Sequence, residues 1–337
     1  MSPEVHPIRP RIGIVTPALA DANNGNWQTA RRWSRMLAAR CEVHLLSRWP
    51  DPSAPELDVL LALHARRSAD SIAAWADRHP DRTLIVALTG TDLYRDIATD
   101  ASAQHSLKVA HRLLVLQDNG PHELPIDLRT KCRVVFQSCS SRQPLLKTRR
   151  HLRVVVVGHL RSEKSPRTVL EVARLLSPED GIRIDHLGNA LDPELGRAAQ
   201  STMAECPHYR WWGGVSHAQA RGHIQRAHVL LHPSQMEGGA HVIMEAVTSG
   251  TPVLASEVPG NIGMLGHDYG GYFPWGDAAR AAALLRECRQ ALRLNTTPNL
   301  LSQLHAQCEL RAPLFAPQRE AQTLRELVLD PFNPHPH

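Results

Sequence analysis

The sequence predicts an α/β fold with two open, mainly parallel sheets. Short apolar runs, of the kind that buried parallel strands give, alternate with segments whose apolar residues recur at helical spacing. Twice a strand is followed by a glycine-containing loop and then a helix, the geometry in which α/β folds bind ligands. The 337 residues are enough for two domains of ordinary size.

The first half of the chain alternates strands with helices. The predicted strands are 11–16, 43–46, 59–63, 84–88, 113–116 and 133–136. A helix follows the polar turn at residues 23–26, and an amphipathic helix covers 68–79. The segment 140–151 is polar and basic and contains Pro144, so we expect the domain boundary there, with an N-terminal domain over residues 1–145.

A second α/β domain is predicted over residues 150–312. Its first strands are 154–157 and 182–187, and a short strand within 209–215 precedes a helix capped by Ser216. Amphipathic helices are expected at 277–294, 300–311 and 317–329. The last of these lies in the segment 313–337, whose final residues we expect to be flexible.

The stretch 229–260 reads as strand, loop, helix and strand. Gly238 and Gly239 form the loop, and the helix 240–248 ends at Gly250. A glycine-rich loop that opens a helix directs several N–H groups toward one point, which favours phosphate. Glu237 and Glu245 are better suited to accept hydrogen bonds from sugar hydroxyls. An ordinary strand–loop–helix unit with incidental acids is the alternative.

Bulk properties limit the function classes. No apolar run approaches the ~20 residues of a membrane span, and the N-terminus lacks a signal-peptide apolar segment, so we expect a cytoplasmic protein without membrane contact. The net charge of +5 suits an anionic substrate, although it also suits nucleic acid. The six cysteines lack metal-ligand spacing and no Asp-x-Asp motif lies in a plausible loop, so we expect no metal and no cofactor.

The stretch 229–260 resembles the donor-site signature of the retaining GT-B glycosyltransferases. The matching residues are Pro233, Ser234, Glu237, Gly238, Glu245, Ala246, Gly250, Pro252 and Val253. The resemblance implies two Rossmann-like domains facing across a cleft, with a C-terminal helix that crosses back to the N-terminal domain. It implies that the donor is bound by Gly158, Gly188, Asn189, Gly238, Gly239, Ala240, His241 and Glu245.

The resemblance also implies three catalytic residues. Lys164 keeps the family spacing from Gly158, whereas His159 occupies the position of the family arginine. Arg161, two residues on, is the candidate for the missing cation. Such cations stabilise the charge that develops on a departing nucleoside diphosphate. Glu237 is expected to contact the hexose. Solvated surface side chains are the alternative for Lys164 and Arg161.

Acceptor residues are expected in the first domain. In the family, the loop after the first strand lies beside the donor phosphates and the acceptor, and Thr89-Gly90-Thr91-Asp92 resembles a His-Gly-x-Asp stretch at the cleft. The candidates are Asn24, Gly25, Asn26, Arg31, Thr89 and Gly90. Arg31 and Arg32, one turn into the helix, could face an anion, and solvated helix residues are the alternative. The family histidine is replaced by Thr89, which leaves the role of that position open.

The segments TPALADANNGNWQTARRW and HPSQMEGGAHVIMEA are similar to those of one bacterial subgroup, the selenosugar synthases of the selenoneine pathway. That resemblance implies transfer of a sugar from UDP-N-acetylglucosamine or UDP-glucose to selenophosphate, which forms a 1-seleno-sugar. Residue chemistry alone does not single out selenium. A transferase for another acceptor, a nucleotide-sugar epimerase on the same fold, and a basic nucleic-acid-binding protein remain as alternatives.

Overall fold

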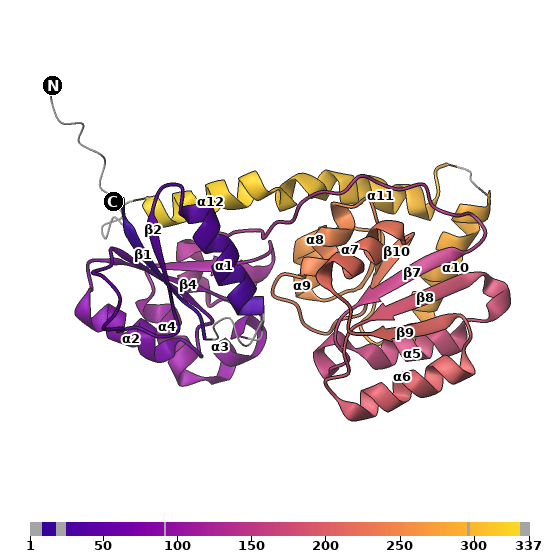
Figure 1. Ribbon diagram of the computed structural model, residues 1–337, viewed down its shortest axis with the longest axis horizontal. Helices are drawn as coiled ribbons and strands as arrows, with labels where there is room; N and C mark the ends of the chain where they lie inside the picture. Colours follow the sequence, from indigo (N-terminus) through magenta and orange to yellow (C-terminus); the bar gives the residue numbers. More distant parts are fainter. Residues whose placement is uncertain (1–8, 18–24, 91, 295–296, 331–337) are drawn as a thin grey trace, which may run out of the picture. The chain divides into compact units, whose positions relative to one another are not determined.

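The computed structural model describes residues 9–17, 25–90, 92–294 and 297–330 (Figure 1). The chain divides into two compact units, one formed by Met1–Phe136 with Gln318–His337 and the other by Gln137–Pro317. The division after Phe136 precedes the segment 140–151 in which the boundary was expected. The basic run 147–150 is part of the second unit, directly before its first strand.

Within the described residues, the first unit contains a six-stranded parallel sheet in the order β2-β1-β3-β4-β5-β6. Its strands are β1 (Arg11–Val15), β2 (Glu42–Leu46), β3 (Val59–Leu63), β4 (Thr83–Ala87), β5 (Arg112–Val115) and β6 (Cys132–Val134). Its helices are α1 (Gly25–Leu37), α2 (Ala69–Arg78), α3 (Ile97–Thr99) and α4 (Ala101–Val109), with a π-helical turn η2 (Asp92–Asp96). Every residue of β3 and β4 is buried, which is why both strands are continuous apolar runs.

The C-terminal helix α12 (Pro317–Leu329) packs on the first unit, as the resemblance implied. Leu324, Leu327 and Val328 join its apolar core. Glu320, only 1% exposed, accepts hydrogen bonds from Trp33 Nε1 at 2.7 Å and from Arg32 Nε at 3.2 Å. Arg32 is therefore held in an ion pair within the fold.

The described part of the second unit contains a parallel sheet in the order β12-β11-β10-β7-β8-β9. Its strands are β7 (Leu152–Val157), β8 (Ile182–Leu187), β9 (Tyr209–Gly213), β10 (Val229–His232), β11 (Val253–Ser256) and β12 (Tyr272–Phe273). Its helices are α5 (Pro166–Leu175), α6 (Pro193–Glu205), α7 (His217–Arg226), α8 (His241–Val247), α9 (Pro259–Leu265), α10 (Ala278–Leu294) and α11 (Leu300–Arg311). In Figure 1, α5 and α6 lie on one side of β7–β9, and α7 and α8 lie on the other.

The structure differs from the sequence predictions in several elements. Helices α4, α6 and α9 had no predicted counterpart. Gly25 and Asn26, expected in a polar turn, instead form the first turn of α1. Apart from adjacent residues and the helix's own main chain, no atom of the described residues lies within 4 Å of where a Cβ on Gly25 would be, so packing among them does not require glycine at that position. Asn24 lies outside the described residues.

Candidate active site

An ion pair between Lys164 and Glu237 lies at the carboxyl edge of the second sheet. Lys164 ends a short 3₁₀ turn, η5 (Ser162–Lys164), between β7 and α5, and Glu237 lies in the loop between β10 and α8. Lys164 Nζ is 2.5 Å from Glu237 Oε1. The main chain joins the two loops, because the N–H of Gln235 donates to the carbonyl of Glu163 at 2.9 Å. Two of the three predicted catalytic residues, Lys164 and Glu237, therefore come together.

Glu237 is held in its charged form despite its burial. The residue is only 9% exposed, and burial alone would raise the pKa of its carboxyl. The ammonium of Lys164 and the ring of His232 outweigh that effect and hold the pKa well below its usual range. His232 Nε2 lies 3.1 Å from Glu237 Oε1. His232 was not a predicted site residue.

The turns after β7 and β8 approach each other through main-chain atoms. Gly188 has φ +147°, and a Cβ there would lie 2.0 Å from the carbonyl oxygen of Gly158. The next residue, Asn189, donates its N–H to His159 Nδ1 at 3.1 Å. Only glycine fits at position 188, so this predicted donor residue has a clear structural requirement.

His159 and Arg161 differ in charge and exposure. Burial, followed by the nearby Arg161 and Lys164 cations, lowers the pKa of His159 below its usual value. His159 is therefore neutral at pH 7 and adds no positive charge. Arg161 is about half exposed, and its Nε lies 3.9 Å from Oε2 of Glu163. Its assignment as the substitute cation stays a prediction.

Glu245 has two basic neighbours from α7. This carboxylate, 6% exposed, accepts from His217 Nε2 at 2.6 Å and lies 3.9 Å from Nη1 of the buried Arg221. His217 and Arg221 are four residues apart, so they share one face of the helix that Ser216 caps. Their helical spacing was visible in the sequence, but their contact with Glu245 depends on the fold.

The loop before α8 contains the remaining predicted donor residues. Gly238 is buried, Gly239 is half-buried, Ala240 is the N-cap residue and His241 begins the helix. No side-chain hydrogen bond caps α8 within the described residues. Binding of a diphosphate at this loop remains a prediction.

In the first unit, the side chain of Asp92 forms hydrogen bonds to the loops that follow β3 and β4. Its fully buried carboxylate accepts from Ala65 N at 3.1 Å and from Thr89 N at 3.0 Å. Burial raises its pKa above the usual value. Thr89 Oγ1 is buried without a hydrogen-bond partner in the described part of the chain, and Gly90 has φ +150°. Arg31 is exposed on α1.

The described residues contain no group of three or more His, Cys, Asp or Glu side chains arranged to hold a metal ion. In the same residues, no helix has both the length and the apolar character needed to span a bilayer.

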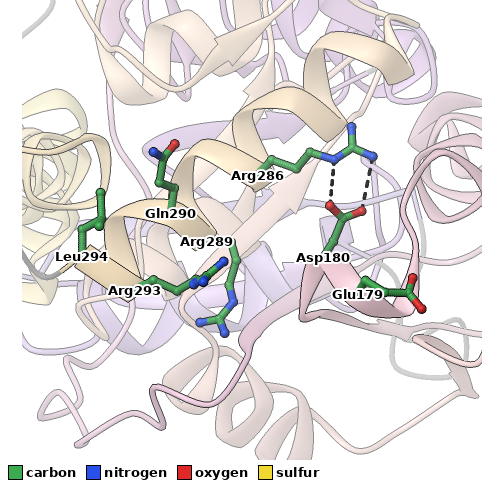
Figure 2. Close-up of a pocket in the computed structure, with 7 residues that line it drawn as sticks. All are labelled: Glu179, Asp180, Arg286, Arg289, Gln290, Arg293 and Leu294. Atoms are coloured by element: carbon green, nitrogen blue, oxygen red, sulfur yellow. Dashed lines mark hydrogen bonds and ion pairs between the residues drawn. The ribbon is translucent and has the colours of Figure 1, made fainter.

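A cavity of about 450 Å³ lies at the opposite, amino edge of the second sheet, beside the residues that precede β8 (Figure 2). Two of its three arginines have protein partners. Arg286 pairs with Asp180 at 3.0 and 3.3 Å, and Arg289 donates to the carbonyls of Arg149 and Arg150. We therefore interpret these arginines as structural and assign the cavity no role in the site.

Comparisons with known proteins fit this geometry. Residues 140–303, which include the Lys164–Glu237 pair and Glu245, match the family model described as glycosyl transferases group 1. A relative, glycosyltransferase 1 domain-containing protein 1 of Xenopus tropicalis, is 27% identical over 119 residues, which are 35% of this chain and 34% of the frog protein. The chain thus matches about a third of that relative.

Solved structures resemble most of the chain. HepE from Anabaena, in complex with UDP and glucose, has a TM-score of 0.71 at 14% identity, covering 96% of this chain and 100% of HepE. Sucrose-phosphate synthase from Thermosynechococcus elongatus has a TM-score of 0.71 at 15% identity, covering 95% and 98%. TarM from S. aureus has a TM-score of 0.62 at 13% identity, covering 82% of this chain and 55% of TarM.

These similarities, together with the two six-stranded parallel sheets in the described residues, define the class: the chain has the GT-B glycosyltransferase fold. Its second unit contains the region similar to group 1 glycosyl transferases.

Proposed function

We propose that the chain is a glycosyltransferase that uses a UDP-sugar donor. The observation that carries the proposal is the Lys164–Glu237 pair at the carboxyl edge of the sheet, within the segment that matches the glycosyl transferase model. UDP is bound in the solved structures of HepE and TarM, which supports the choice of nucleotide.

In the proposed mechanism, the donor diphosphate binds beside Lys164 and the loop at Gly238 and Gly239. An ammonium has three donors, so Lys164 can keep Glu237 as a partner while it binds a phosphate oxygen. Its fixed charge then stabilises the leaving UDP. Glu245 accepts hydrogen bonds from the ribose hydroxyls, and Glu237 accepts them from the hexose.

For the acceptor, we propose selenophosphate, on the basis of the resemblance to selenosugar synthases. Its selenium is anionic and soft, so it attacks the anomeric carbon without a general base. The bond from that carbon to the UDP oxygen breaks and a carbon–selenium bond forms. Water then cleaves the selenium–phosphorus bond, which releases phosphate and leaves a 1-seleno-sugar.

The test is incubation of the full chain with UDP-N-acetylglucosamine or UDP-glucose and selenophosphate, followed by mass spectrometry. We expect a hexose product with a selenium isotope pattern, and turnover lower by orders of magnitude in Lys164→Ala. Arg280→Gln, which alters an exposed pair with Glu287, is the matched control and should retain turnover. Parallel reactions with thiophosphate and phosphate test acceptor choice. UDP release without a selenium product would refute the acceptor, and absence of UDP binding would refute the transferase proposal.

A further inference from the structure

A second cavity lies at the carboxyl edge of the same sheet, on the side of η5 and α5. Its volume is about 330 Å³, within the range of small-molecule sites. Four loops line it: those after β7, β8, β10 and β12 contribute Ser165, Asp192, Gln235 and Trp275, respectively. Convergence of several strand-to-helix loops at this edge is the usual location of ligand sites in α/β folds.

Trp275 contributes an aromatic surface to this cavity. The side chain is 50% exposed, although a tryptophan is normally mostly buried. Its orientation is fixed, because Nε1 donates to Ser165 Oγ at 2.9 Å. A rigid, half-exposed indole binds a flat ligand surface without a large loss of side-chain entropy. Packing of Trp275 within the protein does not account for the exposed half of its ring.

The other lining groups limit the chemistry of the ligand. Pro166 and Leu195 are buried apolar residues at the cavity wall, while Gln235 and Arg167 are exposed polar residues there. The carboxylate of Asp192 also faces the cavity and caps α6. Donors and acceptors around an apolar wall suit a neutral ring with hydroxyl groups. The wall has one carboxylate, Asp192, and one guanidinium, Arg167, so it does not select a bare anion, and the polar groups disfavour a lipid chain.

We propose that this cavity binds a pyranose ring of a carbohydrate, with the apolar face of the ring stacked on Trp275 and its hydroxyls hydrogen-bonded to Gln235 and Asp192. The site is separate from the nucleotide site of the proposed function, because Lys164 and Glu237 do not line it. Both sites share the turn at residues 162–165. Occupancy of the cavity therefore places a sugar next to the residue that holds the donor.

The test measures sugar binding without nucleotide. Glucose, N-acetylglucosamine and maltose are titrated into the full chain, and binding is followed by saturation-transfer NMR and by tryptophan fluorescence. We expect at least one of them to bind the wild type, with affinity about tenfold weaker in Trp275→Ala, since ring stacking contributes on that scale. Trp212→Ala is the matched control, because Trp212 is 39% exposed on β9 and does not line the cavity.

Two further arms separate this proposal from the proposed function. Lys164→Ala should retain sugar binding, and Trp275→Ala should retain UDP binding, measured by calorimetry. Circular dichroism confirms that each variant is folded, and Trp275→Phe provides a ring of smaller area if the alanine variant does not fold. Sugar binding that is equal in wild type, Trp275→Phe and Trp275→Ala would overturn the proposal, as would failure of all three sugars to bind wild type. Uridine binding that depends on Trp275 would also overturn it.

Discussion

Replacement of Lys164 by alanine should lower stability as well as activity, in a manner that depends on pH. The substitution leaves the buried Glu237 without its ammonium partner. Breaking a buried pair costs about 3–5 kcal/mol, and because the Lys164 side chain is 20% exposed we expect a smaller loss, about 2–3 kcal/mol. Urea unfolding of the full chain at pH 7.5 measures this difference in unfolding free energy.

The pH dependence follows from the pKa of Glu237. In the wild type that pKa is lowered, so the pair contributes stability above the unfolded value of about 4.3 and loses it as the pH falls toward the folded value. In Lys164→Ala, His232 is the remaining neighbour named above that lowers the pKa of Glu237, and we expect burial to outweigh it and to raise that pKa. The protonated carboxyl is then favoured in the fold, so the variant loses stability as the pH rises through that raised value.

The difference in unfolding free energy between wild type and Lys164→Ala should therefore shrink from pH 7.5 to pH 5. Arg161→Ala is the control, because Arg161 is about half exposed and should change stability little at either pH. Equal stabilities of wild type and Lys164→Ala at pH 7.5 would refute the reasoning. A difference that stays constant between the two pH values would show that the Glu237 charge is not its origin.

Three other predictions concern the scaffold. Gly188→Ala, whose Cβ would lie 2.0 Å from Gly158 O, should cost about 3 kcal/mol or more in thermal unfolding, whereas Gly25→Ala, with open space, should be within about 0.5 kcal/mol of wild type. Glu320→Gln, which loses its charge beside Arg32, should cost about 1–2 kcal/mol in urea unfolding, and the exposed Glu326→Gln should be neutral. Burial lowers the pKa of Lys147 to about 8, so its contribution to wild-type stability should fall as the pH is lowered from 10 to 8. Lys147→Met should lack that change, and parallel pH profiles for the two proteins would contradict the prediction.

Buried strands were the most predictable part of the fold. The strands Val59–Leu63 and Ile182–Leu187 match their predicted bounds, because the hydrophobic pattern breaks at both ends of each strand. The helices 300–311 and 317–329 also match. Other predicted ends differ by one or two residues, where capping contacts and not periodicity decide the boundary.

The helix α9 shows why some elements escaped prediction. Gly260 and Gly263 lie within it, and glycine lowers the intrinsic helix propensity of a segment. Gly260 is required by packing instead: a Cβ there would lie 1.9 Å from the carbonyl oxygen of Glu237. The close approach of the Glu237 main chain therefore requires glycine at position 260, although local propensity would place glycine in a turn.

Candidate site residues could be named where they belong to one local pattern. Lys164, Glu237 and Glu245 follow from the resemblance of two strand–loop–helix units to the family pattern. Their neighbours His232 and His217 do not follow from a local pattern. The contact between His217 and Glu245, which are 28 residues apart, arises only when the strands assemble into a sheet. Electrostatics that depend on such contacts, including the low pKa of Glu237, cannot be inferred from sequence spacing.

Two main-chain approaches position the Lys164–Glu237 pair. Gly188 lets the turn after β8 press against Gly158, at the start of the loop that leads to Lys164. Gly260 lets α9 press against the main chain of Glu237. A side chain at either glycine would displace one partner of the pair. A shift of about 1 Å would lengthen the charge-assisted hydrogen bond beyond normal donor–acceptor distances. The charged pair is thus positioned in advance by rigid main-chain contacts, which is the condition for electrostatic stabilisation without reorganisation during a reaction.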